Sequence, residues 1–222
     1  MRGRFITFEG GEGTGKSTQA RALADRLKSI GIGVVVTREP GGSPGAEAIR
    51  HVLLSGAAKP LGAYAEAILF AAARDDHVRL TIRPALDRGL WVISDRFADS
   101  TRIYQGSLSN VDGRLIQRLE EITVGDTRPD LTLILDLPAE IGLERAAKRR
   151  GAAEGDRFES ETLEFHRKLR EAYLELAEHE PERCAVIDAS ADARQVTDAI
   201  WRLVAARLHP AAQAPASKDA AS

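Results

Sequence analysis

A glycine-rich segment near the N-terminus has the residue types and the spacing of a phosphate-binding loop. It matches the pattern G-x-x-x-x-G-K-[S/T] in full, between a β-rich run and a helical one, which disfavours a mere glycine-rich turn. Glycines let backbone N–H groups converge on phosphate oxygens, and the start of a helix adds its positive dipole end. In such a loop the lysine, Lys16, neutralises phosphate charge and the hydroxyl group of Ser17 ligates Mg²⁺. We therefore predict ATP and Mg²⁺ as cofactors, held by Gly10, Gly11, Glu12, Gly13, Thr14, Gly15, Lys16, Ser17 and Thr18.

The loop by itself does not specify a reaction, because GTPases, motor ATPases, ligases and kinases all carry it. The N-K-x-D segment with which small GTPases read guanine does not occur in the sequence. The chain of 222 residues is also short for most ATPase machines. The chemistry has to be sought in the residues that would bind a second ligand.

Two polar segments directly follow the second and third predicted strands. The first reads T-R-E-P-G-G-S-P over residues 37–44, and the second begins with S-D-R-F at residues 94–97. Ligands of open parallel sheets bind at the carboxyl ends of the strands. Both segments are therefore candidates for the binding site of the second ligand.

Taken in order, these motifs closely resemble the bacterial thymidylate kinases. The resemblance rests on F-E-G-x-E-G-x-G-K-S-T, T-R-E-P-G-G, L-F-x-A-x-R at residues 69–74, D-R-F and Y-Q-G, and it runs from about Phe5 to the last helix. It implies a P-loop kinase that transfers the γ-phosphate of ATP to dTMP, giving dTDP and ADP for dTTP biosynthesis. It also implies a homodimer. The alternatives are a kinase for another nucleoside or nucleotide, and a nucleotide-gated switch that hydrolyses ATP slowly.

The resemblance assigns acceptor-site roles to individual residues. Phe70 matches the aromatic residue that stacks on thymine, and Arg74, one helical turn later, matches the arginine that donates to the O4 atom of the base. Arg96 matches the arginine that clamps the acceptor phosphate, which a planar guanidinium suits well. Asp95 is expected to orient Arg96 and to reach Mg²⁺ through water, and Tyr104 to pack under the sugar. The remaining substrate-binding matches are Glu39, Arg50, Thr101 and Gln105.

Each of these positions also has a structural interpretation. Phe70 suits a core position on a helix, and Tyr104 suits a half-buried structural position. Arg74 is able to form a solvated ion pair with Asp75 or Glu66, and Asp95 with Arg96 can be a structural pair.

The source of positive charge at the γ-phosphate is a separate question, because none of the variable loop positions, residues 11–14, is basic. The resemblance points to a lid over residues 149–158, whose arginines cover the donor phosphates. It adds Arg149, Arg150 and Arg157 to Lys16 and Arg96 as catalytic residues. The alternative for Arg149 and Arg150 is a cationic helix C-terminus.

No general base is needed for this reaction, because the acceptor phosphate is largely dianionic at neutral pH. The sequence contains five histidines without the spacing of a metal site, and we expect all of them to be structural or on the surface. Catalysis is then a matter of positioning and positive charge.

The elements that must position these residues alternate between short β-rich runs and longer helical runs. Strands are predicted at 5–9, 34–37, 91–95, 131–137 and 185–188, and helices at 16–30, 45–54, 63–88, 112–124, 139–150, 161–179 and 193–208. Such alternation predicts an α/β fold with a parallel five-stranded sheet flanked by helices on both faces. The glycine-rich loop and the resemblance imply that this fold is of the P-loop NTPase type, with a short lid. We expect a single kinase domain over residues 1–209 and a disordered tail over 210–222.

Composition narrows the function classes further. The 31 Lys and Arg residues against 33 Asp and Glu residues give a net charge of −2, which argues against a nucleic-acid partner. The single cysteine, Cys184, rules out an intrachain disulfide and indicates a reducing, cytoplasmic location. No apolar stretch approaches the roughly 18 residues of a membrane span, and the N-terminal apolar run is too short for a signal peptide.

Overall fold

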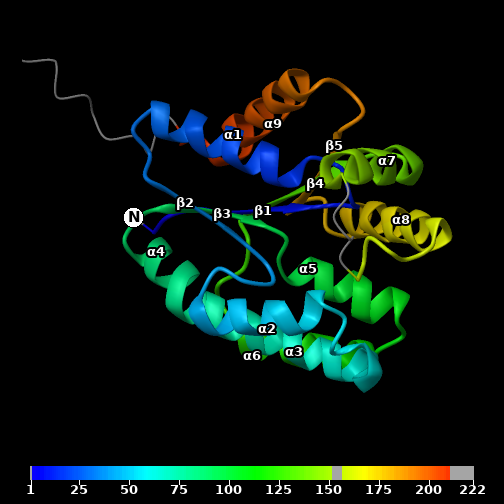
Figure 1. Cartoon of the computed structure of the whole chain (residues 1–222). Helices are drawn as coiled ribbons and strands as arrows, with labels where there is room; N and C mark the ends of the chain where they lie inside the picture. The colour runs from blue at the N-terminus through cyan, green and yellow to red at the C-terminus, as the bar shows by residue number, and fades with distance from the viewer. Residues whose placement is uncertain (1, 152–156, 211–222) are drawn as a thin grey trace, which may run out of the picture.

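A parallel β-sheet organises the computed structural model, which describes residues 2–151 and 157–210 (Figure 1). Its five strands lie in the order β2-β3-β1-β4-β5. The strands are β1 (Phe5–Glu9), β2 (Val34–Arg38), β3 (Trp91–Asp95), β4 (Leu131–Asp136) and β5 (Cys184–Asp188). Every neighbouring pair is parallel, so the predicted sheet is confirmed.

Helices cover both faces of the sheet. On one face α1 (Lys16–Ser29) and α9 (Ala193–Leu208) lie side by side, as Figure 1 shows, and their apolar residues share a core with Ile6 and Phe8 of β1. The alternation of side chains along a strand sends Phe5 to the other face, where it packs in a second cluster with Phe97. The two apolar layers explain why the strands read as nearly continuous apolar runs.

The second face carries most of the remaining helices (Figure 1). They are α2 (Pro44–Leu54), the short 3₁₀ turn η1 (Lys59–Leu61), α3 (Gly62–His77), η2 (Val78–Ile82), α4 (Arg83–Asp87), α5 (Ala98–Thr101), η3 (Arg102–Leu108), α6 (Gly113–Thr123) and α8 (Leu163–His179). The helix α7 (Ala139–Arg150) follows β4 and contacts α8.

Two helical predictions need correction. The helix predicted over 63–88 is interrupted by the π-helical segment η2, which precedes Pro84 near the start of α4. Proline has no N–H group with which to continue an α-helical ladder, and the preceding backbone adopts the wider turn instead. No helix was predicted between residues 88 and 112, whereas the structure is helical there through α5 and η3.

Strand register brings the predicted motifs together at one edge of the sheet. Asp95 of β3 is level with Arg38 of β2 on one side and with Phe8 of β1 on the other. The glycine-rich loop leaves β1 at the same edge. The chain reverses its strand order around β1, which is where ligands bind in open α/β sheets.

Parts of two predictions lie outside the described residues, namely residues 152–156 of the expected lid and residues 211–222 of the expected tail. Within the described residues, no helix combines the length and the apolar character that crossing a membrane requires.

Candidate active site

The glycine-rich loop needs its glycines for backbone shape and for close packing. Gly10, Gly13 and Gly15 have φ angles of 127°, 68° and 93°. A Cβ atom on Gly13 would lie 1.9 Å from the carbonyl oxygen of Gly142, so α7 packs directly on the loop. Only glycine combines these angles with that approach, and the loop is thereby held open to a ligand at the start of α1.

Lys16 and Ser17 lie where the loop enters α1. The Nζ atom of Lys16 donates to the carbonyl oxygens of Gly10 at 3.1 Å and Gly11 at 2.6 Å. Burial, and next the nearby Arg96 guanidinium, lower the pKa of Lys16 to about 8. The hydroxyl group of Ser17 donates to the carboxylate of Asp95, so the two predicted metal ligands are already in contact.

Arg96 occupies the centre of the site. Its side chain is 16% exposed, and Nη2 donates to Oε1 of Glu12 at 2.5 Å. Burial alone would raise the pKa of Glu12, but Arg96 and Lys16 lower it to about 2. Asp95 was expected to orient Arg96; among the described residues the ion-pair partner of Arg96 is Glu12, and Asp95 accepts from Ser17.

Arg74 is held by a chain of buried polar residues. Its Nε donates to Oε2 of Glu39 at 2.9 Å, and its Nη2 donates to Oγ1 of Thr101 at 2.9 Å. The other oxygen of Glu39 bonds Nδ1 of His77 at 3.0 Å, and Nε2 of His77 bonds Thr37 at 2.7 Å. The alternative of a solvated ion pair for Arg74 is therefore wrong, because its side chain is only 4% exposed and its partner is Glu39.

Most of the predicted residues line one cavity of about 380 Å³ beside the loop, whereas Gly10, Gly11, Thr14, Arg150 and Arg157 do not line it. From the loop it is lined by Glu12, Gly13, Gly15, Lys16, Ser17 and Thr18, and from the predicted acceptor side by Glu39, Arg50, Phe70, Arg74, Asp95, Arg96, Thr101, Tyr104 and Gln105. Tyr104 is buried and carries the Arg96 guanidinium 5.3 Å from its ring centre. The cavity thus joins a phosphate-binding loop to a polar and aromatic chamber.

The lid arginines have different surroundings. Arg149 lines the cavity, and both Arg149 and Arg150 donate to the carboxylate of Glu159, at 3.2 and 2.5 Å. Arg157 pairs with the buried Glu66 of α3 at 3.1 Å, on the acceptor side of the site. The structure therefore brings Arg149 and Arg150 together at Glu159, with Arg149 lining the cavity, and pairs Arg157 with Glu66.

Sequence reasoning missed eight residues that line the cavity: Arg21, Arg38, Pro40, Leu54, Phe97, Ser100, Phe158 and Glu159. Arg38 belongs to the quoted T-R-E-P-G-G motif, so a signal was present. Phe158 packs against Tyr104 and Phe70, with ring centres 5.2 and 6.2 Å apart. A contact between segments so distant in sequence has no local signal.

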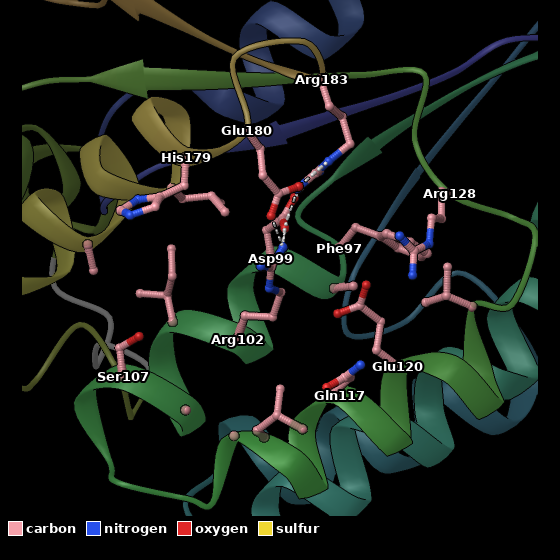
Figure 2. A pocket seen from close by; sticks show the side chains of 18 of the residues that line it. Phe97, Asp99, Arg102, Ser107, Gln117, Glu120, Arg128, His179, Glu180 and Arg183 are labelled. Carbon is pink, nitrogen blue, oxygen red and sulfur yellow. Dashed lines mark hydrogen bonds and ion pairs between the residues drawn. The ribbon is translucent and has the colours of Figure 1, made fainter.

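A second cavity, of about 770 Å³, lies between α5, α6 and α8 (Figure 2). Four of its charged side chains pair with one another: Arg183 donates to Asp99 at 2.6 Å and to Glu180 at 2.7 Å, and Arg102 pairs with both carboxylates. Phe97 borders both cavities. None of the predicted site residues lines this second cavity.

Comparisons with known proteins agree with this geometry. A profile of the family described as thymidylate kinase matches residues 8–200. A thymidylate kinase of Nitrobacter winogradskyi is 61% identical over 201 residues, covering 90% of this chain and 87% of that protein. One of Bradyrhizobium diazoefficiens is 61% identical over 209 residues, covering 94% and 92%. The crystal structure of thymidylate kinase from Ehrlichia chaffeensis matches with a TM-score of 0.73 at 32% identity, covering 92% of this chain and 99% of that one.

Proposed function

The chain belongs to the thymidylate kinase family, and from that premise we propose how its residues transfer the γ-phosphate of ATP to dTMP. The family makes the protein a dTMP kinase of nucleotide biosynthesis, with dTDP and ADP as products. One observation carries the residue assignment: the loop, Arg96 and the pair Phe70 and Arg74 line the same cavity of about 380 Å³. Donor and acceptor can therefore meet in it.

The donor half of the cavity fits ATP with Mg²⁺. The positive φ angles of Gly10, Gly13 and Gly15 shape a cradle of backbone N–H groups for phosphate oxygens. The hydroxyl group of Ser17 and the carboxylate of Asp95 are hard oxygen donors of the kind that Mg²⁺ prefers. Bound there, Mg²⁺ would neutralise charge on the phosphates. Lys16 is expected to exchange its bonds to the loop carbonyls for bonds to the phosphates.

The acceptor half has a phosphate end and a base end. At the phosphate end, Nη2 of Arg96 donates a hydrogen bond to Glu12, and we expect the dTMP phosphate to replace Glu12 as the acceptor. At the base end, Nε and Nη2 of Arg74 are bonded to protein, which leaves Nη1 for the O4 atom of thymine. Phe70 supplies a stacking face and Tyr104 packs under the sugar. Glu39 and Thr101 hold Arg74 in place, Gln105 bonds Glu66, and Arg50 donates to Pro40.

Catalysis in this arrangement relies on alignment and positive charge. The acceptor phosphate is already largely ionised and needs no base. Lys16 and Arg96 face the reacting groups from the loop and from β3, and Arg149 and Arg150 approach from the end of α7. Arg157 takes part only if it exchanges Glu66 for phosphate.

The rival functions make different demands on the acceptor residues. A switch that only hydrolyses ATP does not need Arg74 and Arg96 in the cavity. A cytosine nucleotide would place its amino donor against Arg74, which is also a donor. ADP release, measured with each nucleoside monophosphate in turn, tests the proposal. We expect dTMP to give the fastest release. Release that is equally fast without any acceptor would favour the switch.

A homodimer is part of the proposal, supported by apolar side chains on adjoining helices. Tyr64 and Ile68 of α3 are each 52% exposed, and Ile122 of α6 is 75% exposed. The two helices contact each other, so these side chains can form one patch to bury against a second copy. Sedimentation of the parent and of an Ile68→Glu variant tests this, with a shift to monomer expected in the variant.

We further propose that residues 1–209 act as a single kinase domain in the cytoplasm, without a nucleic-acid or membrane partner. The net charge of −2 and the single, buried cysteine support this placement.

A further inference from the structure

A carboxylate that the mechanism does not use lies buried directly behind Arg96. Glu9, the last residue of β1, is 0% exposed. Its Oε1 accepts from the backbone N–H of Phe97 at 2.8 Å, and its Oε2 accepts from the hydroxyl groups of Ser100 at 2.7 Å and Tyr173 at 2.9 Å. Within the described part of the chain, Glu9 forms no ion pair. Burying a carboxylate without a countercharge in contact is costly, so this residue calls for a reason.

The reason lies in the hydrogens of the two hydroxyl groups. The oxygens of Ser100 and Tyr173 each lie 3.3 Å from Nη1 of Arg96. Each hydroxyl group has one hydrogen to donate, and an ionised carboxylate can only accept. The two oxygens also lie 3.1 Å from each other, but when Glu9 is ionised it takes both hydrogens and leaves the lone pairs of both oxygens facing the guanidinium. A neutral side chain of the same shape would not impose that arrangement.

Glu9 also fixes the backbone that carries Arg96. Arg96 has a φ angle of 70°, which is unusual for a residue with a side chain. Its N–H donates to the carbonyl oxygen of Phe8 at 2.9 Å, and the next N–H, that of Phe97, donates to Glu9. Such a backbone conformation persists only where the surroundings hold it firmly. Glu9 thus bonds the backbone N–H group directly after Arg96 and the two hydroxyl groups that lie beside the Arg96 side chain.

We propose that Glu9 is a positioning residue for Arg96, acting through Ser100, Tyr173 and the N–H of Phe97 to aim the guanidinium at the acceptor phosphate. The inference rests on the proposed function of Arg96. It adds to the site a residue that touches no substrate. It also gives the F-E-G motif before the loop a role in acceptor binding.

The electrostatic surroundings of Glu9 predict that acceptor binding depends on pH, which provides a second test. Burial, and next the charge of Asp99, raise the pKa of Glu9 to about 7. The charged or titratable groups around it are Arg96, Lys16 of α1, Asp99 of α5, Tyr104 of η3 and Tyr173 of α8. A protonated Glu9 becomes a donor and disturbs the hydroxyl arrangement. Acceptor binding should therefore weaken as the pH falls through about 7.

The experiment compares the parent with Glu9→Gln. An amide must point its NH₂ group either at the N–H of Phe97 or at the two hydroxyl groups, so both orientations break the arrangement. We expect KM for dTMP to rise roughly tenfold, with KM for ATP nearly unchanged. The value of kcat/KM for dTMP reports groups of the free enzyme. In the parent, the pH profile of kcat/KM for dTMP should show a step near 7 from Glu9. The variant should lack that step and keep the step near 6 that comes from the dTMP phosphate.

A matched control is Thr7→Val, in the same strand. Thr7 is equally buried and bonds Thr132 at 2.8 Å, and it has no contact with Arg96. This variant should lose some thermal stability yet keep KM for dTMP and the pH profile. If it raised KM for dTMP as much as Glu9→Gln does, the effect would be one of general stability and the proposal would fail.

Two further variants separate the possible outcomes. If Arg96→Ala left KM for dTMP unchanged, the proposed function of Arg96 would be at fault. If Arg96→Ala raised it while Glu9→Gln changed neither KM nor the pH profile, the inference about Glu9 would be overturned. Should Glu9→Gln fail to fold, Tyr173→Phe decides, because it removes one of the two oxygens and keeps the carboxylate. We expect a severalfold rise in KM for dTMP, and an unchanged value would overturn the proposal.

Discussion

Replacing Arg74 by alanine should reduce the preference for thymine and lower the stability of the protein at the same time. The guanidinium is bonded to protein through Nε and Nη2, and Nη1 is the donor assigned to the O4 atom of the base. Losing one charged hydrogen bond costs about 1.5–3 kcal/mol, or roughly ten- to a hundredfold in kcat/KM for dTMP. The value for dCMP should change less, because cytosine presents a donor at that position. The ratio of the two values should therefore fall.

The stability effect follows from the burial of the ion pair. The side chains of Arg74 and Glu39 are 4% and 5% exposed, so the variant leaves a buried carboxylate without its cation. Breaking a buried pair in this way costs about 3–5 kcal/mol. For a chain of this size, each kcal/mol shifts the melting temperature by about 2–4 °C. We expect a fall in Tm on the order of 10 °C, and kinetics must be measured well below the new transition.

A matched control for this prediction is His77→Gln. His77 supports Glu39 from the side opposite to Arg74 and is fully buried. The variant should lower Tm while keeping most of the preference for dTMP over dCMP, since the donor to the base is still present. Steady-state kinetics on both monophosphates provide the assay. If Arg74→Ala left the ratio of kcat/KM values at the parental level, Arg74 would not read the base and the acceptor model would be refuted.

Further predictions concern the loop, the sugar and the lid. Lys16→Ala should abolish turnover with an unchanged far-UV circular dichroism spectrum, because its charge acts on phosphates; near-normal activity would contradict the loop assignment. Tyr104→Ala should admit ribose monophosphates better by removing a wall near C2′, and an unchanged preference for deoxyribose in a folded variant would count against it. Arg149→Ala and Arg150→Ala should lower kcat far more than ATP affinity, as expected for contacts made in the transition state. Arg157→Ala should do so only if Arg157 leaves Glu66. Near-parental kcat in the triple variant would exclude the lid as the source of charge.

Local spacing was enough to predict the sheet and the meeting of three motifs at one of its edges, whereas the individual acceptor and lid residues came from the family resemblance. The glycine-rich loop, the T-R-E-P-G-G segment and the D-R-F segment each follow a strand of a parallel sheet. Their convergence follows from the topology once the strands are recognised. The placement of Phe70 and Arg74 on one face follows from helical periodicity in the same way.

Contacts between distant segments could not be predicted in this manner. Asp95 was expected to orient Arg96, yet within the described residues Arg96 forms its ion pair with Glu12 and Asp95 accepts from Ser17. The role of Glu9 depends on Tyr173, which lies 164 positions away. Such pairings are set by the packing of α8 against β4, and neither partner carries a local signal of the other.

The hydrogen-bond partners of His77 could not be predicted from the sequence either. His77 was expected to be an ordinary structural histidine, and it is indeed fully buried, but its bonds to Thr37 and Glu39 place it behind the base-reading arginine. The sequence shows a histidine three residues after Arg74 and no more than that. Only the fold reveals that a side chain on the helix supports a loop after β2.

The most direct test of the whole account follows the label from γ-³²P-ATP in the presence of Mg²⁺ and each nucleoside monophosphate separately. We predict that the label appears in dTDP, faster with dTMP than with dCMP, dAMP or dGMP, and that Lys16→Ala forms none. Label that appeared only as inorganic phosphate, or faster in another nucleoside diphosphate, would contradict the central claim that this cavity joins ATP to dTMP.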